Sequence, residues 1–360
     1  MSSPPASTAS ASGEAKPASI PAAPGAIASP AAAGSAPALV AGSAIRVAAM
    51  KKELTMLGVL VALALITALL NPLFLGADNL RNNVRHISLI SLFALGEAVV
   101  IIAGGIDLSI GSVICIAAVT TSYLTMYMDV GIGTAVVAGV VASLLIGVGQ
   151  GLVIARLGVQ PFVVTLGSML LLRGVAEVLT GGTDIGFQGK FPGFRFLGEG
   201  NALGMPVPFW FALGAIVIVA FLMHRTLFGR YCYAIGSNAE AARLSGVPVR
   251  AVRLVTFIAS ALLSGFAGIL YVAYLPTATP SLGSAYELHA VAAAVLGGCS
   301  LQGGRGSVFG VLIGAGIMQV TFNAVNLVGH SLWQNVVAGG VILVAVIVDR
   351  TFEKNAKRRT

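Results

Sequence analysis

The sequence of this 360-residue chain is dominated by long apolar runs, each about as long as a membrane-spanning helix. A helix needs ~20 mainly apolar residues to cross the hydrocarbon core of a bilayer. Only 9% of the residues are charged, whereas a soluble domain carries about a quarter. A chain with so few charges cannot cover itself with a hydrated surface, so we expect it to fold in lipid.

We therefore predict an all-α fold, a polytopic transmembrane helix bundle with about ten spans. A β-barrel is excluded because the apolar runs are continuous, whereas barrel strands alternate in polarity. The span near 287–298 is interpreted as a short or re-entrant span. The predicted spans lie near 54–74, 87–103, 108–128, 133–155, 161–180, 208–224, 252–273, 287–298, 307–325 and 332–349.

Segments outside the bundle differ sharply in composition. Residues 1–45 are almost entirely Ala, Pro, Ser and Gly, which predicts a disordered tail because there is little apolar surface to bury. No basic segment leads directly into an apolar stretch there, so a secretory signal is not indicated. We predict a transmembrane permease domain over 46–349 and a basic C-terminal tail over 350–360.

The distribution of Lys and Arg predicts the orientation of the chain. If the N-terminus is cytoplasmic, most of the 21 basic residues fall in cytoplasmic segments, as the positive-inside rule requires. Arg173 lies within a span. The outside segments hold only Arg81, Arg85, Lys190 and Arg195. Both termini are therefore predicted to be cytoplasmic, and the net charge of +8 reflects topology rather than nucleic-acid binding.

The stretch SNAEAARLSGVP, residues 237–248, predicts a short capped helix between two spans on the cytoplasmic side. Ser237 and Glu240 have the S-x-x-E spacing of a capping box. Gly246 can adopt the left-handed conformation that ends a helix, and Pro248 prevents its continuation. The helix is either a simple connector or a docking element that transmits motion from a soluble partner.

Four stretches resemble the ribose/xylose/galactose-type permease subunits of bacterial ATP-binding-cassette (ABC) sugar importers. GGIDLSIGS at 104–112 resembles the signature of this family. The other three, in family order, are RLGVQPFVVTLGSMLLLRGVAEVLTGG (156–182), TLFGRYCYAIGSNAEAARLSGVPV (226–249) and AVLGGCSLQGGRGSVFGVLIGAG (294–316).

The resemblance implies a permease of the bacterial inner membrane that works as a dimer with a second permease copy. Its other partners would be a cytoplasmic ATPase and a periplasmic sugar-binding protein, and its substrate a small sugar. The short helix would be the coupling helix received by the ATPase, formed by Ser237, Asn238, Glu240, Ala241, Ala242, Arg243, Leu244 and Gly246.

The chain has no GxxxxGK[ST] loop, so ATP and Mg would be used by the partner ATPase and no cofactor is expected on this chain. No metal-ligand cluster and no nucleophile–base pair is apparent in the sequence, so we expect no metal site and no catalytic residues. The three cysteines are widely separated, which suggests neither a disulfide framework nor a metal site.

Intramembrane polar residues are candidates for the substrate path, because such groups normally face a bundle interior or a watery cavity. Glu97, Asp107 and Ser109 are the candidates here. Asp107 either caps the helix that follows it or accepts hydrogen bonds from sugar hydroxyls. Arg173 and Glu177 are spaced to pair on one helix face.

The outside loop 181–207 is predicted to dock the binding protein. Phe187 and Phe194 would supply apolar area, while Lys190 and Arg195 would supply steering charge. The alternative function is an ion-coupled secondary transporter of a small polar solute, with an intramembrane carboxylate as its ion site. A secondary transporter has no partner that requires the capped cytoplasmic helix, so the sequence favours the importer.

Overall fold

The computed structural model describes residues 36–187, 190–275, 277–334, 336–341 and 343. The chain divides into two units after Arg46, and all the candidate membrane spans of the described residues lie in the unit that begins at Val47. Most of the predicted disordered tail and all of the predicted basic tail, 350–360, lie outside the described residues. Residues 36–45, which the sequence assigns to the disordered tail, are helical and form the start of α1.

Eight of the described helices are long and apolar enough to cross a membrane. The long helices are α1 (Ala36–Leu70, apolar from Glu53), α2 (Ala77–Ile102), α3 (Ile110–Tyr127), α4 (Ile132–Leu157), α5 (Pro161–Thr180), α7 (Val207–Arg225), α10 (Val249–Tyr274) and α12 (Val308–Leu327). The shorter elements are the 3-10 helices Pro72–Leu75 and Ser331–Trp333, α6 (Pro192–Glu199), α8 (Leu227–Ser237), α9 (Ala239–Leu244), α11 (Tyr286–Leu296) and the strands β1 (Ile185–Gly186), β2 (Asn201–Ala202), β3 (Met205–Pro206) and β4 (Thr277–Ala278).

These helices confirm the predicted fold class, an all-α polytopic membrane protein. α11 has 11 residues and is too short to span, which agrees with the short or re-entrant segment expected near 287–298. The predicted span 332–349 lies largely outside the described residues.

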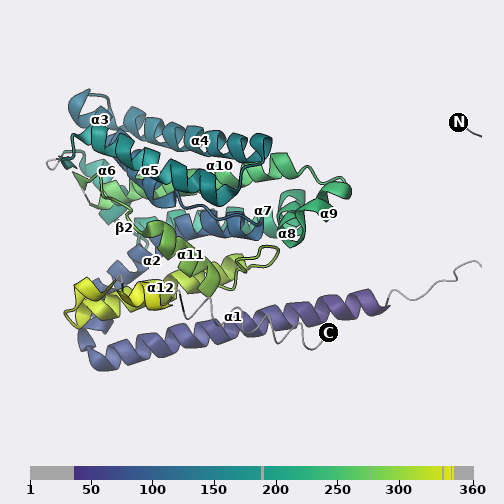
Figure 1. The fold of residues 1–360 in the computed structure, drawn as a ribbon. Helices are drawn as coiled ribbons and strands as arrows, with labels where there is room; N and C mark the ends of the chain where they lie inside the picture. Colours follow the sequence, from purple (N-terminus) through teal and green to yellow (C-terminus); the bar gives the residue numbers. More distant parts are fainter. Residues whose placement is uncertain (1–35, 188–189, 276, 335, 342, 344–360) are drawn as a thin grey trace, which may run out of the picture. The chain divides into compact units, whose positions relative to one another are not determined.

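α2 is the central helix of the bundle (Figure 1). In its apolar window 89% of the residues are buried, against 6% for the window of α1 that begins at Glu53. It packs against α7, α10, α11 and α12, and α10 in turn packs along α4. Close approach depends on small residues; at Gly268 of α10, for example, an added methyl group would overlap the backbone of Ile114 on α3.

Two long connections lie at opposite ends of the helices. The first joins α7 to α10 and consists of α8 and α9 (Figure 1). The second joins α5 to α7 and consists of β1, α6 and the hairpin of β2 with β3. β1 also pairs antiparallel with β4, which follows α10. The sequence analysis predicts α9 but not α8: residues 227–237 are expected to be part of a loop, although Phe228, Cys232 and Ile235 recur at helical spacing and α8 packs its Cys232 and Ile235 inward.

Candidate functional site

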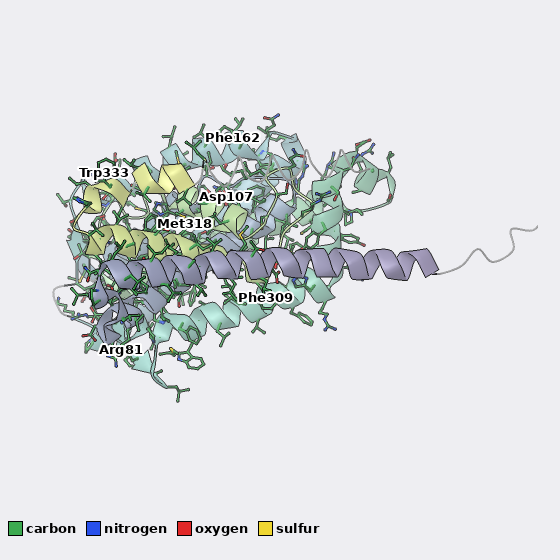
Figure 2. The ribbon with its side chains drawn as sticks, turned by 90° about the horizontal axis from the view of Figure 1, so that it is seen from below. Arg81, Asp107, Phe162, Phe309, Met318 and Trp333 are labelled. Atoms are coloured by element: carbon green, nitrogen blue, oxygen red, sulfur yellow. The ribbon has the colours of Figure 1, made fainter. Side chains whose placement is uncertain are left out.

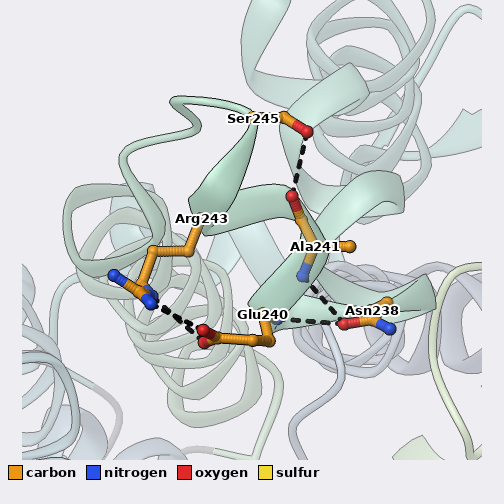
Figure 3. A network of polar contacts seen from close by, with 5 residues as sticks. All are labelled: Asn238, Glu240, Ala241, Arg243 and Ser245. Atoms are coloured by element: carbon orange, nitrogen blue, oxygen red, sulfur yellow. Dashed lines mark hydrogen bonds and ion pairs between the residues drawn. The ribbon is translucent and has the colours of Figure 1, made fainter. Parts of the chain in front are cut away.

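The short helix α9 is capped at its start by Asn238 rather than by Ser237. The Asn238 Oδ1 atom accepts hydrogen bonds from the backbone N–H groups of Glu240 (3.1 Å) and Ala241 (2.9 Å) (Figure 3). Ser237 is the last residue of α8, and its hydroxyl donates to the Tyr233 carbonyl oxygen. The predicted capping box is therefore wrong by one residue, because α8 occupies the position expected to be a loop.

Glu240 pairs with Arg243 one turn along α9 (Figure 3). The Arg243 Nε donates to a Glu240 carboxylate oxygen at 3.0 Å. This hydrogen bond and the charge of Arg243 lower the pKa of Glu240 below its usual range and raise the pKa of Arg243. Both side chains are exposed, so the pair offers a charged surface to a partner more than it stabilises the fold.

The end of α9 has the left-handed glycine that the sequence predicts. Gly246 has a φ of +83°, and its N–H donates to the Arg243 carbonyl oxygen at 3.0 Å. The Val247 N–H donates to the Ala242 carbonyl oxygen, so two of the last carbonyls are satisfied. Ala242 lies on the buried face of α9, whereas Leu244 is 74% exposed and adds an apolar contact point to the surface.

α8 rests directly on two glycine-rich turns of the bundle. An added methyl group at Gly236 would overlap the Ile102 carbonyl oxygen and the Gly304 backbone nitrogen. Gly304 donates its N–H to that same Ile102 oxygen at 2.9 Å, and the Tyr233 hydroxyl donates to the Gly306 carbonyl oxygen at 3.0 Å. Any movement of α8 and α9 therefore acts on the end of α2 and on the turn before α12.

The predicted substrate-path residues meet inside the bundle, where Asp107 lies among the helices (Figure 2). The Asp107 N–H donates to the Glu97 carboxylate at 3.2 Å. One Asp107 carboxylate oxygen accepts from the Ser109 N–H and hydroxyl, and the other from the Ser260 hydroxyl at 2.8 Å. The Gln150 amide donates to the Ser109 hydroxyl oxygen.

This buried cluster holds the turn between α2 and α3. Both oxygens of Asp107 accept hydrogen bonds from neighbouring protein groups, and Glu97, Asp107 and Ser109 are at most 1% exposed. Asp107 braces the residue before α3 without capping the helix, because its carboxylate accepts from Ser109 and not from an N–H group of α3. Its contact with sugar stays a prediction. The sequence reasoning missed Gln150 and Ser260, which lie on α4 and α10 and have no local signal connecting them to this turn.

Arg173 does not make the ion pair predicted with Glu177. Its guanidinium instead donates to the carbonyl oxygens of Pro280 (3.2 Å) and Leu282 (2.6 Å). The ion pairs found among the described residues are Arg81–Asp78, Arg195–Glu199 and Arg243–Glu240. A side chain within the bundle gains more by satisfying buried carbonyls than by pairing with the exposed Glu177.

Two aromatic residues predicted for docking are buried in the core of the bundle instead. Phe187 and Phe194 are 1% and 6% exposed, and their rings lie 5.6 Å apart. Phe196 is 51% exposed and borders an open pocket of about 290 Å³ lined by Pro192, Arg195, Phe196, Glu199 and Gly200. Lys190 is exposed, and Arg195 pairs with Glu199. The surface that docking would use is therefore formed by α6.

Within the described ranges, no group of three or more His, Cys, Asp or Glu side chains is placed to hold a metal ion. The described part of the chain thus offers a charged connector at one end, a buried polar turn and an aromatic loop at the other end. Together with the eight candidate spans, this combination defines a polytopic helical membrane protein.

The chain belongs to the family described as branched-chain amino acid transport system / permease component, whose model matches residues 79–346. It is therefore the permease component of a transport system and not an enzyme, and such a component acts with an ATPase and a binding protein.

Named relatives are similar over most of the chain. The ribose import permease protein RbsC of Escherichia coli K12 is 39% identical over 83% of this chain and 93% of its own length. RbsC of Bacillus subtilis is 40% identical over 80% and 89%, respectively. The L-arabinose transport system permease protein AraH of Escherichia coli K12 is 35% identical over 84% and 92%. No solved structure matches the chain. The resemblance stated from the four sequence stretches is thereby confirmed.

Proposed function

We propose that this chain is the inner-membrane permease of an ABC importer for a monosaccharide of the ribose and arabinose class. The family description names branched-chain amino acids, whereas the relatives described above carry sugar names at 35% to 40% identity over more than four-fifths of the chain. Similarity of this extent favours the sugar over the amino acid.

In this proposal each of the two connections receives one soluble partner. A separate ATPase, which uses ATP and Mg, receives α9 on the cytoplasmic side, and a periplasmic binding protein delivers sugar at the loop 181–207. Two copies of the permease form the dimer, and both termini are cytoplasmic. The observation that supports this most is α9, which is capped at both ends, exposed on its charged face and seated through α8 on the end of α2.

The ion-coupled alternative is disfavoured by the family, and the buried cluster removes Asp107 as its ion site. An ion site needs carboxylate oxygens that are free to bind the ion. Asp107 has both oxygens occupied by Ser109 and Ser260. Its cluster therefore has the geometry of a structural turn.

Uptake in membrane vesicles tests the proposal. The chain is reconstituted with its ATPase and binding protein, and the uptake of labelled D-ribose, L-arabinose and L-leucine is measured with ATP and, separately, with an ion gradient. We expect uptake of a pentose that requires ATP and survives an uncoupler. Uptake that persists without ATP and collapses with the uncoupler would contradict the importer, and uptake of leucine alone would contradict the sugar.

A further inference from the structure

The segment 277–285, between α10 and α11, takes a non-helical course into the depth of the bundle. It starts at β4, which pairs with β1 just after the end of α5. Five residues beyond Ala278, Gly283 packs against Gly111 in the first turn of α3, so closely that an added methyl group on either would meet the backbone of the other. α11 follows directly and has only 11 residues, Tyr286–Leu296.

Arg173 fixes the depth of this segment. It lies seven residues before the end of α5 at Thr180, which is roughly 10 Å along a helix. Its guanidinium donates to the Pro280 and Leu282 carbonyl oxygens. The Cys115 thiol of α3 donates to the Pro280 carbonyl oxygen at 3.4 Å. The backbone of 279–283 thus lies beside the spans α3 and α5, several residues inside the end of α5.

Non-helical backbone at this depth is tolerated only where protein buries it or where it borders water. One side of the segment is buried, since Leu282 is 8% exposed and Gly283 is also buried. The other side carries Ser281 and Ser284, which are exposed. Exposed hydroxyls on irregular backbone are unfavourable in lipid, so this side faces an aqueous path.

Glu287 is a partly exposed carboxylate just beyond this segment, in the first turn of α11. Its Oε2 atom is buried against Gly111 of α3 with no hydrogen-bond partner in the described structure, so the exposed part of the carboxylate is what a substrate could reach. Just before it, Ala285 is held at a φ of 67°, a left-handed conformation that costs a non-glycine residue energy. Strain of this kind persists only where the surroundings enforce it, and it concentrates at functional sites.

We propose that residues 279–287 form the sugar-contacting surface of the translocation path, with Ser281, Ser284 and Glu287 hydrogen-bonding the sugar hydroxyls. A carboxylate accepts from hydroxyl groups, while serine hydroxyls both donate and accept, which suits a polyhydroxyl substrate that must also be released. Arg173 is a positioning residue, because it holds the Pro280 and Leu282 carbonyls and not the sugar. The proposal rests on the proposed function for the identity of the substrate.

The aqueous location is tested by cysteine labelling in cells that express the whole transporter. Ser284→Cys is compared with Leu145→Cys, a change at a residue of α4 that is 64% exposed within its span. The three native cysteines are buried, and the parent gives their background. We expect a membrane-impermeant methanethiosulfonate reagent to modify Ser284→Cys, and saturating D-ribose to slow the reaction. Equal reactivity of the two variants, or no reaction of Ser284→Cys, would overturn the proposal.

The role of Glu287 is tested by ATP-driven uptake in vesicles. Glu287→Gln keeps the shape and removes the charge, so D-ribose uptake should fall about tenfold, the equivalent of one charge-assisted hydrogen bond. 2-Deoxy-D-ribose lacks one of the hydroxyls that Glu287 could accept from, so its uptake should fall less. The ratio of the two uptake rates therefore changes between the parent and the variant. A purely structural role would lower both uptakes equally, and that result would overturn the contact.

The two failures can be told apart. If the parent complex imports neither D-ribose nor L-arabinose with ATP, the proposed function fails. If the parent imports a pentose but Ser284→Cys behaves like Leu145→Cys, the function stands and the inferred path is wrong.

Discussion

The two long connections are built on different physical principles. The 181–206 connection is held by aromatic side chains, because Phe187 and Phe194 are buried in the core of the bundle and Phe187 also contacts the ring of Phe191 edge to face. The α8–α9 connection buries small and aliphatic side chains in the same core and adds close backbone contacts: Gly236 against Ile102 and Gly304, and the two caps of α9. A surface that receives a binding protein can rest on a stable aromatic centre, whereas one that transmits motion must be joined rigidly to the helices it moves.

The largest effect is expected from a substitution in the aromatic side chains that hold the 181–206 connection. Phe187→Ala removes a fully buried ring and should lower the free energy of unfolding by about 3–5 kcal/mol. Phe196→Ala is the matched control, because Phe196 is half-exposed and its loss should leave stability within about 0.5 kcal/mol. Thermal denaturation of the purified protein in detergent measures both. Equal losses would show that Phe187 does not hold the connection.

The second largest effect is expected from a substitution that disrupts the backbone contacts beneath α8. Gly236→Ala adds a methyl group where the Ile102 oxygen and the Gly304 nitrogen already lie, and overpacking of this kind costs about 1–3 kcal/mol. Gly214→Ala on α7 is the control, since nothing lies within 4 Å of its added methyl group. We expect the first variant to hydrolyse ATP without importing sugar, and the second to behave as the parent.

Assembly decides how a loss in Gly236→Ala is interpreted. The variant should still insert and bind the ATPase, because Gly236 lies in α8 and the exposed face of α9 is unchanged. Import and stimulated hydrolysis equal to those of the Gly214→Ala control would show that α8 does not transmit motion through this contact.

The parts of the fold that the sequence predicts are those with a local cause. Apolar runs give the spans, and Gly246 gives the end of α9 because only a left-handed residue can close a helix in that way. The short span near 287–298 is also local, since the apolar run there is too brief to cross a bilayer. These features depend on residues within a few positions of one another.

The parts that the sequence does not predict depend on distant contacts. Arg173 bonds to carbonyls about 110 positions further along the chain, and no local pattern distinguishes this from a pair with Glu177. Phe187 is buried in the core of the bundle, whereas loop aromatics are ordinarily expected at the surface. The error at Ser237 has a local cause. Ser237 is the last residue of helix α8 and is therefore not available as a cap, so Asn238 caps α9.

The smallest expected effect separates the cap of α9 from its surface charge. Glu240→Gln removes the ion pair with Arg243 but keeps the Asn238 cap, so α9 should remain folded. The pair is exposed and screened by salt, so its loss should change the stability little. Asn238→Ala removes the cap itself and should cost the helix about 1 kcal/mol.

The dependence on pH has a definite sign. Arg243 lowers the pKa of Glu240 in the folded protein, so the stabilisation from this ion pair is complete above the ordinary pKa of 4.5 and is lost as the pH falls through the lower folded value.

At neutral pH the loss of the cap should matter more than the loss of the ion pair. ATP-driven uptake and binding of the ATPase, measured in low and high salt, should fall more in Asn238→Ala than in Glu240→Gln. If Glu240→Gln is the more damaging and its defect grows at low salt, then Glu240 contacts the ATPase directly, and the charged face of α9, rather than its rigidity, carries the coupling.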